Sequence, residues 1–108
     1  MSTSREYAQR ANEAAFDPDS TSQLFRLTGA DASIALLAGA HILTLPGTVP
    51  AFMRFGAAAV APTGATAVPG FWLEPGVPCG IVAGEAATLH GLLVGGVGPA
   101  DVRVTRLL

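Results

Sequence analysis

The stretch that decides the fold is residues 70–94, GFWLEPGVPCGIVAGEAATLHGLLV. It holds three short runs of apolar, aromatic or β-branched residues, which cover residues 71–74, 79–83 and 88–94. Pro75-Gly76-Val77-Pro78 separates the first two runs and Gly84-Glu85 the last two. Runs of this length between glycine and proline signals are typical of strands joined by turns. We therefore interpret the stretch as a strand, a turn, a second strand, a hairpin tip at Gly84-Glu85 and a return strand.

The same pattern continues on both sides of this stretch. Further strand-length runs cover residues 23–28, 33–38, 41–45, 51–55 and 102–107. The clearest alternation is at residues 101–106, DVRVTR, where Val102 and Val104 face one way and the polar residues the other. About seven or eight short strands over residues 23–108 predict an all-β domain, a small antiparallel β-sandwich of jelly-roll type.

Residues 1–22 have a different character and are predicted to form an N-terminal arm. Thr3 and Glu6 have the spacing of a capping box, and Glu6 and Arg10 have the spacing of a helix-stabilising ion pair. Pro18 ends the pattern, and isolated helices this short are marginal in water. We expect a short helix or an extended segment that becomes ordered only against a partner or against the sandwich.

Charge is scarce and unevenly distributed. Only 13% of the residues are charged, and between Phe55 and Ala100 the only formal charges are Glu74 and Glu85. A net charge of −2 without a basic cluster argues against nucleic-acid binding. No run approaches the roughly 20 strongly apolar residues of a membrane helix, and the polar start lacks a signal peptide's apolar core. We expect a soluble protein that binds neither nucleic acid nor membrane.

Residues that carry catalytic or metal chemistry are few. His41 and His90 are far apart in the sequence, and no nucleophile elbow, phosphate loop or His-Glu-x-x-His motif is present. A metal-dependent enzyme of cupin type would need about three ligands and could draw only on His41, His90 and Glu85. Cys79 has no partner cysteine and is expected to be a small buried thiol. We expect no catalytic, cofactor-binding or metal-binding residues, and keep a small cupin-like enzyme as an alternative.

Trp72 is the residue most open to a binding role. Neighbouring residues of a strand point to opposite faces, so one of Phe71 and Trp72 should be in the core and the other outward. Aromatic side chains are favoured interface anchors, and Trp72 is a possible anchor of this kind. The alternative is a sugar- or receptor-binding module of a tail or fibre, which would bind its ligand through Trp72 or the long loop 57–69.

Three segments of the chain carry a resemblance to a known class of proteins. They are AFMRFG at 51–56 followed by an Ala/Thr/Pro loop, GFWLEPGV at 70–77, and ADVRVT at 100–105. In spacing and composition they resemble small β-sandwich virion proteins of tailed phages and of phage-like particles such as gene transfer agents. The resemblance covers about the last 60 residues. It implies a capsid decoration (cement) protein or the base of a head spike.

The charge distribution leads to a matching hypothesis about partners. A charge-poor sandwich gains by burying apolar surface in a ring of identical subunits, and an arm that cannot fold alone gains by docking on a partner. We expect a homo-oligomer, a trimer or pentamer, attached to the major capsid protein or another virion protein. The expected contact residues of the arm are Arg5, Tyr7, Arg10 and Phe16. The protein would be made in the host cytoplasm, reside on the capsid surface of the virion and carry no cofactor.

Overall fold

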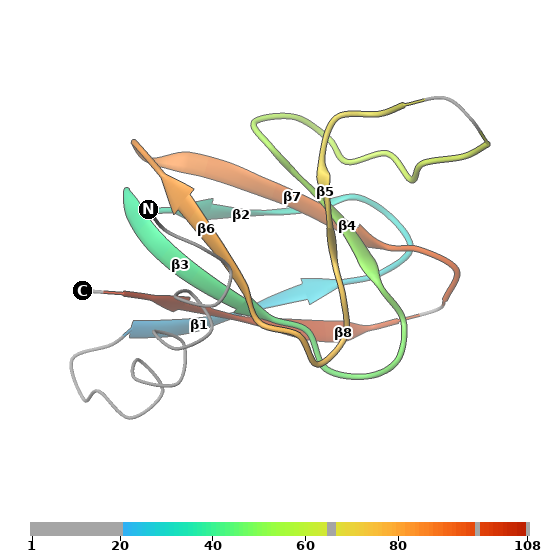
Figure 1. Ribbon diagram of the computed structural model, residues 1–108, viewed down its shortest axis with the longest axis horizontal. Helices are drawn as coiled ribbons and strands as arrows, with labels where there is room; N and C mark the ends of the chain where they lie inside the picture. Colours follow the sequence, from blue (N-terminus) through green and yellow to red (C-terminus); the bar gives the residue numbers. More distant parts are fainter. Residues whose placement is uncertain (1–20, 65–66, 97, 108) are drawn as a thin grey trace.

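The computed structural model describes residues 21–64, 67–96 and 98–107, and this part of the chain is all β. The eight strands are β1 (Thr21–Leu27), β2 (Ala32–Leu36), β3 (Gly39–Thr44), β4 (Ala51–Phe55), β5 (Phe71–Leu73), β6 (Cys79–Ala83), β7 (Ala87–Leu93) and β8 (Ala100–Arg106). They form two four-stranded sheets that lie face to face (Figure 1). Sheet A has the order β1-β8-β3-β6, and sheet B has the order β2-β7-β4-β5. Every pair of neighbouring strands is antiparallel.

The strand pairing is nested. β1 pairs with β8, β2 with β7, β3 with β6, and β4 with β5, as if one long hairpin had been rolled into two layers. Additional pairing of β3 with β8 and of β4 with β7 joins these pairs into the two sheets. This arrangement is a jelly roll, and the predicted β-sandwich is confirmed.

Two expectations about the strands need correction. The sandwich includes Thr21 and Ser22, which were expected to belong to the arm, because they pair with Arg106 and Thr105. The predicted hairpin through Gly84-Glu85 is wrong: β6 pairs with β3 in sheet A, whereas β7 lies in sheet B. The turn carries the chain from one sheet to the other, because the nested pairing gives each of these strands a more distant partner.

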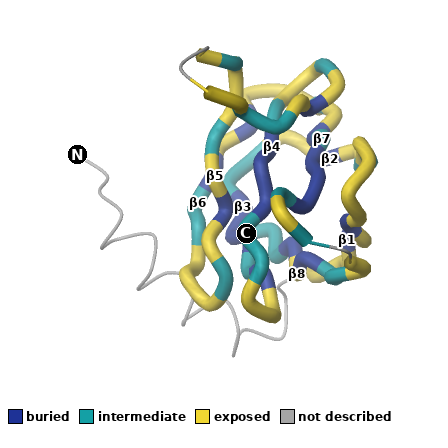
Figure 2. The backbone as a smooth tube through the Cα atoms, turned by 90° about the vertical axis from the view of Figure 1, so that its right-hand side faces the viewer, coloured by how far each residue is buried: buried dark blue, intermediate teal, exposed yellow. Residues whose placement is uncertain are grey.

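The core lies between the sheets, and it is built from alternate residues of the strands. Figure 2 shows buried segments in the central parts of the strands and exposed segments at the turns. Fully buried examples are Leu27, Leu43, Met53, Leu89 and Val102. Alternation is visible in β1, where Phe25 and Leu27 are buried and the residues between and before them are exposed.

The loop between β4 and β5 covers part of the outer face of sheet B. It forms the long excursion at the top of Figure 1. The Ala59 N–H donates to Asp31 Oδ1 over 2.9 Å, and Arg54 Nη1 donates to the Ala58 carbonyl over 3.4 Å. Ala59 is buried, as are Phe52 and Leu92, which lie outside the main core cluster. This side of the sandwich is therefore covered by the chain's own loop.

Gly70 closes the loop over Phe52. Its φ of 143° lies in a region that residues with a Cβ rarely adopt. A Cβ at this position would also overlap the Met53 carbonyl oxygen and the Phe52 ring. Only glycine allows the chain to return to β5 so close to β4. No helix in the described ranges is long and apolar enough to cross a membrane.

Candidate functional site

The predicted arm contacts cannot be placed. Arg5, Tyr7, Arg10 and Phe16 lie outside the described residues, which begin at Thr21. Their role in partner binding stays a prediction.

Trp72 points outward from β5, with 44% of its surface exposed, whereas Phe71 packs partly against the core. Its ring meets the Phe52 ring edge to face, with centroids 5.3 Å apart and planes at 73°. The expected division between one inward and one outward aromatic is therefore found. Trp72 is firmly placed at the short edge strand of sheet B, where either an interface or a ligand could cover its exposed part.

His41 and His90 do not converge. His41 is 2% exposed and lies in β3 of sheet A, on the face that holds Leu43 and the core. His90 lies in β7 of sheet B, at a position that alternates with buried Leu89 and Gly91 and so faces away from the core. Glu85 is exposed in the β6–β7 turn. Among the described residues no group of three or more histidine, cysteine or acidic side chains is arranged to hold a metal ion.

His90 instead takes part in a structural contact. Its Nδ1 lies 3.1 Å from Asp31 Oδ2, and Asp31 also accepts the Ala59 N–H of the β4–β5 loop. Burial alone would raise the pKa of Asp31, but the hydrogen bond from Ala59 and the interaction with His90 together lower it below its ordinary value. Asp31 therefore holds the loop to sheet B as a carboxylate.

Cys79 begins β6, is partly buried and packs against the core. Burial raises the pKa of its thiol, so the neutral form is favoured near neutral pH. A nucleophilic cysteine needs the opposite environment. The position agrees with the expected structural thiol.

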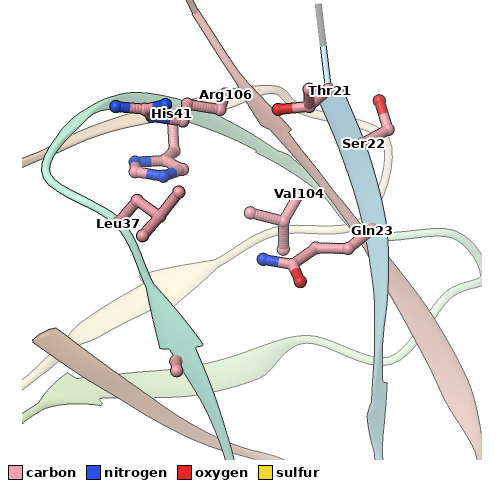
Figure 3. A pocket seen from close by; sticks show the side chains of 8 residues that line it. Thr21, Ser22, Gln23, Leu37, His41, Val104 and Arg106 are labelled. Atoms are coloured by element: carbon pink, nitrogen blue, oxygen red, sulfur yellow. The ribbon is translucent and has the colours of Figure 1, made fainter. Parts of the chain in front are cut away.

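A pocket of about 310 Å³ lies between the end of β2 and the part of sheet A where β1 begins and β8 ends. Thr21 of β1 and His41 of β3 are both register partners of Arg106 in β8, so these three residues form one row across the sheet. Val104 lies in the next row, with Gln23 on one side and Leu43 on the other. Figure 3 shows Arg106, His41 and Leu37 on one side of the pocket and Thr21, Ser22 and Gln23 on the other, with Val104 between them.

Two hydrogen bonds fix the guanidinium at this pocket. Arg106 Nε and Nη2 donate to the Ala38 carbonyl over 3.2 and 2.8 Å. Gly39 has a φ of 130°, which favours glycine, and an added Cβ would make only an ordinary contact with Arg106 Nε at 3.5 Å. Among the described residues no carboxylate pairs with Arg106, whereas Arg26 is paired with Asp101 over 3.0 Å. The pocket therefore presents an oriented cation.

His41 is held neutral beside this cation. Burial lowers the pKa of His41, the hydrogen bond with the Gly39 carbonyl opposes this with a smaller effect, and the positive charge of Arg106 adds a still smaller lowering. Nδ1 lies 3.2 Å from that carbonyl. Because a carbonyl oxygen only accepts, Nδ1 carries the proton and Nε2 is the acceptor of the neutral ring. The pocket thus combines one permanent positive charge with a neutral imidazole.

A second candidate surface is the outer face of sheet A. Leu24 of β1 is 65% exposed and Val82 of β6 is 58% exposed, each between neighbours that face the core. These two strands are the opposite edges of the sheet. β6 has no charged residue or proline, the features that usually protect an edge strand from pairing. Each edge of sheet A therefore carries one large apolar side chain that is more than half exposed.

Comparisons with protein-family models, with curated proteins and with solved structures found no match to this chain. The function is consequently argued from the two surfaces and from the fold.

The sequence analysis missed the pocket because its residues are distributed along most of the chain. The sequence did contain one indication of the pocket, the alternation of faces along a strand. Arg106 follows Val102 and Val104 at two-residue spacing, so it lies on the face of β8 that points to the core. His41 has the same relation to Leu43. Two polar side chains at core-facing strand ends suggest an end pocket once the pairing of β3 with β8 is known.

Proposed function

We propose that this protein is a non-enzymatic structural protein of a virion, a capsid decoration protein or head-spike base of a tailed phage or gene transfer agent. The jelly roll supports this proposal, since it is a common architecture of viral capsid proteins, although lectins and cupins also use it. The resemblance in residues 51–105 supports it as well. Because the fold serves several functions, the surface carries more weight than the topology.

The observation that carries the proposal is the apolar surface on both edges of sheet A. Leu24 marks one edge and Val82 the other, while the loop held by Asp31 covers part of sheet B. Two different patches on opposite edges suit a head-to-tail contact, in which the β1 edge of one subunit meets the β6 edge of the next. Such heterologous contacts close into rings when the rotation allows it. The expected trimer or pentamer is a ring of this kind.

Attachment to the particle is assigned to residues 1–20, which precede β1. In this proposal Arg5, Tyr7, Arg10 and Phe16 contact the major capsid protein or another virion protein. Their mixture of charged and aromatic side chains is typical of interface contacts. The sandwich makes the oligomer and the arm ties it to the shell.

Native mass spectrometry of the full chain tests the ring. We expect a closed oligomer for the wild type and a monomer for Leu24→Glu and for Val82→Glu, since each variant places a charge in every contact. Val77→Glu is the matched control, because Val77 is 57% exposed but lies in the β5–β6 turn, outside sheet A. A monomeric wild type would contradict the proposal.

Mixing the two variants tests the head-to-tail geometry. A Val82→Glu subunit keeps an intact β1 edge, and a Leu24→Glu subunit keeps an intact β6 edge. An equimolar mixture should therefore form mixed dimers, although neither variant associates alone. If the same patch met itself across a two-fold axis, mixing would restore nothing.

Particle binding is tested separately. In a density gradient of a lysate from producing cells, the protein should sediment with capsid-sized particles. Replacing Arg5, Tyr7, Arg10 and Phe16 with alanine in the full chain should move it to the top of the gradient and leave the oligomer intact. Wild-type protein found only at the top would refute the virion assignment.

A sugar- or receptor-binding module of a tail or fibre is the second candidate, favoured by the 44% exposure of Trp72. Trp72 is the only tryptophan of the chain, so its fluorescence reports directly on this surface. Saturable quenching by oligosaccharides, lost in Trp72→Ala, would favour this candidate over a purely structural role.

A further inference from the structure

We propose that the pocket bounded by Arg106, His41 and Leu37 is a binding site for a small organic carboxylate with an apolar side group. The site does not depend on the proposed virion function. It lies at the end of the sandwich, and the apolar patches at Leu24 and Val82 are not part of it.

The charge in the pocket selects the ligand's charge. Arg106 has a guanidinium that is fixed by the Ala38 carbonyl through Nε and Nη2, which leaves Nη1 without a partner among the described residues. None of the described residues that line the pocket is acidic. A planar guanidinium matches a carboxylate better than it matches a neutral group. An anion would therefore find an oriented partner in this pocket.

The single charge favours a monocarboxylate over a phosphate. His41 stays neutral, so Arg106 is the one cation among the described residues that line the pocket. One guanidinium would neutralise only half of the charge of a phosphate dianion, whereas it neutralises the whole charge of a carboxylate. Thr21 and Gln23 add a hydroxyl and an amide group at the opposite wall, whereas the Ser22 hydroxyl is turned to Thr105 on the other face of the sheet.

The remaining lining selects for an apolar group. Ala35, Leu37 and Val104 contribute the apolar wall, and Leu37 is 63% exposed at the pocket. A volume of about 310 Å³ is at the lower end of the range for ligand sites, which are roughly 300 to 1,000 Å³. The pocket fits a group of the size of one acylated amino acid. The ligand is therefore a free carboxylic acid of this size or the C-terminal residue of a peptide.

The first experiment is an NMR titration of ¹⁵N-labelled full-length protein with N-acetyl-leucine. Saturable shifts should be concentrated at Thr21, Gln23, Leu37 and Val104. N-acetyl-leucinamide, which has the same shape without the charge, should bind at least tenfold more weakly. A hydrogen bond to a charged group contributes about 1.5 to 3 kcal/mol, which corresponds to a tenfold or larger change in Kd. Absence of saturable shifts, or equal binding of the amide, would overturn the proposal.

Variants locate the site. Arg106→Gln should weaken N-acetyl-leucine binding at least tenfold, and Arg103→Gln should leave it within twofold, since Arg103 is exposed on the opposite face of β8. Leu37→Glu places a competing carboxylate beside Arg106 at an exposed position that the fold tolerates, and it should also weaken binding at least tenfold. Leu37→Gln controls for the lost apolar contact. Equal effects of Arg103→Gln and Arg106→Gln, or unchanged binding in Leu37→Glu, would refute the assigned site.

A tripeptide distinguishes the two sources of the carboxylate. If acetyl-Ala-Ala-Leu binds at least as tightly as N-acetyl-leucine, the site accepts the C-terminus of a protein chain. If only N-acetyl-leucine binds, the ligand is a free small acid.

Discussion

Replacing Gly70 with alanine tests whether the β4–β5 loop closes over sheet B as described. Gly70 has a φ of 143°, and a Cβ added there would overlap the Met53 carbonyl oxygen and the Phe52 ring. The Met53 carbonyl belongs to the backbone of β4, so it cannot move aside as a flexible side chain could. Gly70→Ala therefore combines backbone strain with a steric clash.

The two contributions can be separated in magnitude. A non-glycine residue in a sparsely populated backbone region costs about 1 to 3 kcal/mol, and overpacking a well-packed site costs a further 1 to 3 kcal/mol. We expect Gly70→Ala to lower the free energy of unfolding by about 2 to 6 kcal/mol. Gly76 is the matched control: its φ is 76°, but no atom lies within 4 Å of an added Cβ. Gly76→Ala should cost only the backbone contribution, about 1 to 2 kcal/mol.

Urea unfolding followed by the fluorescence of Trp72 measures both values, because Trp72 lies against Phe52 at the site of the change. Protein concentration should be held constant, since association of subunits also stabilises the folded state. Equal losses for the two variants would refute the close approach of Gly70 to β4. More of the outer face of sheet B would then be open to a partner, and sheet B would compete with sheet A as the surface of the proposed oligomer.

Three further predictions concern the core, its titration and its thiol. Leu43 is fully buried in β3, so Leu43→Ala should lower the free energy of unfolding in urea by about 2 to 5 kcal/mol. A decrease of less than about 1 kcal/mol would contradict the core position of Leu43. The pKa of His41 is lower in the folded protein than its ordinary value near 6.5, so the unfolded chain binds its proton first as the pH falls. Stability should therefore decrease as the pH falls through about 6.5, the ordinary pKa of histidine, and this decrease should be smaller in His41→Gln; an identical profile for the two proteins would refute the assigned burial. Cys79, whose thiol pKa is raised by burial, should react with a disulfide reagent at neutral pH much more slowly in the folded protein than in urea. Equal rates would show that the thiol is accessible.

The local pattern predicted the strands well and their partners poorly. Residues 51–55 and 79–83 form strands with the predicted bounds, because β-branched and aromatic runs between glycines determine extended structure locally. Gly84-Glu85 suggested a hairpin, but β6 and β7 enter different sheets. Pairing depends on which distant strand completes each apolar face, and no short window of sequence contains that information.

The candidate sites likewise combine features that the local sequence predicts with features that depend on distant strand pairing. Alternation along the strand predicted that Trp72 and Phe71 point to opposite faces, but not which of them points outward. In the structure Trp72 is the outward residue. The row of Thr21, Arg106 and His41 exists only because β8 lies between β1 and β3. Phe52 and Leu92 face away from the core, yet both are buried beneath a loop whose composition is that of an ordinary surface segment.

The nested pairing affects the order in which the strands can pair during folding. β4 and β5 lie in the middle of the chain and can meet early, whereas the contact between Ser22 and Thr105 joins residues 83 positions apart. Closing a loop of this length is slow, because the chain loses conformational entropy before the contact contributes any stabilising energy. Within sheet A, β1 is next to β8 alone, so β1 can pair only after residues 100–106 have been synthesised. In a growing chain β1 is therefore the last strand to acquire its partner in sheet A.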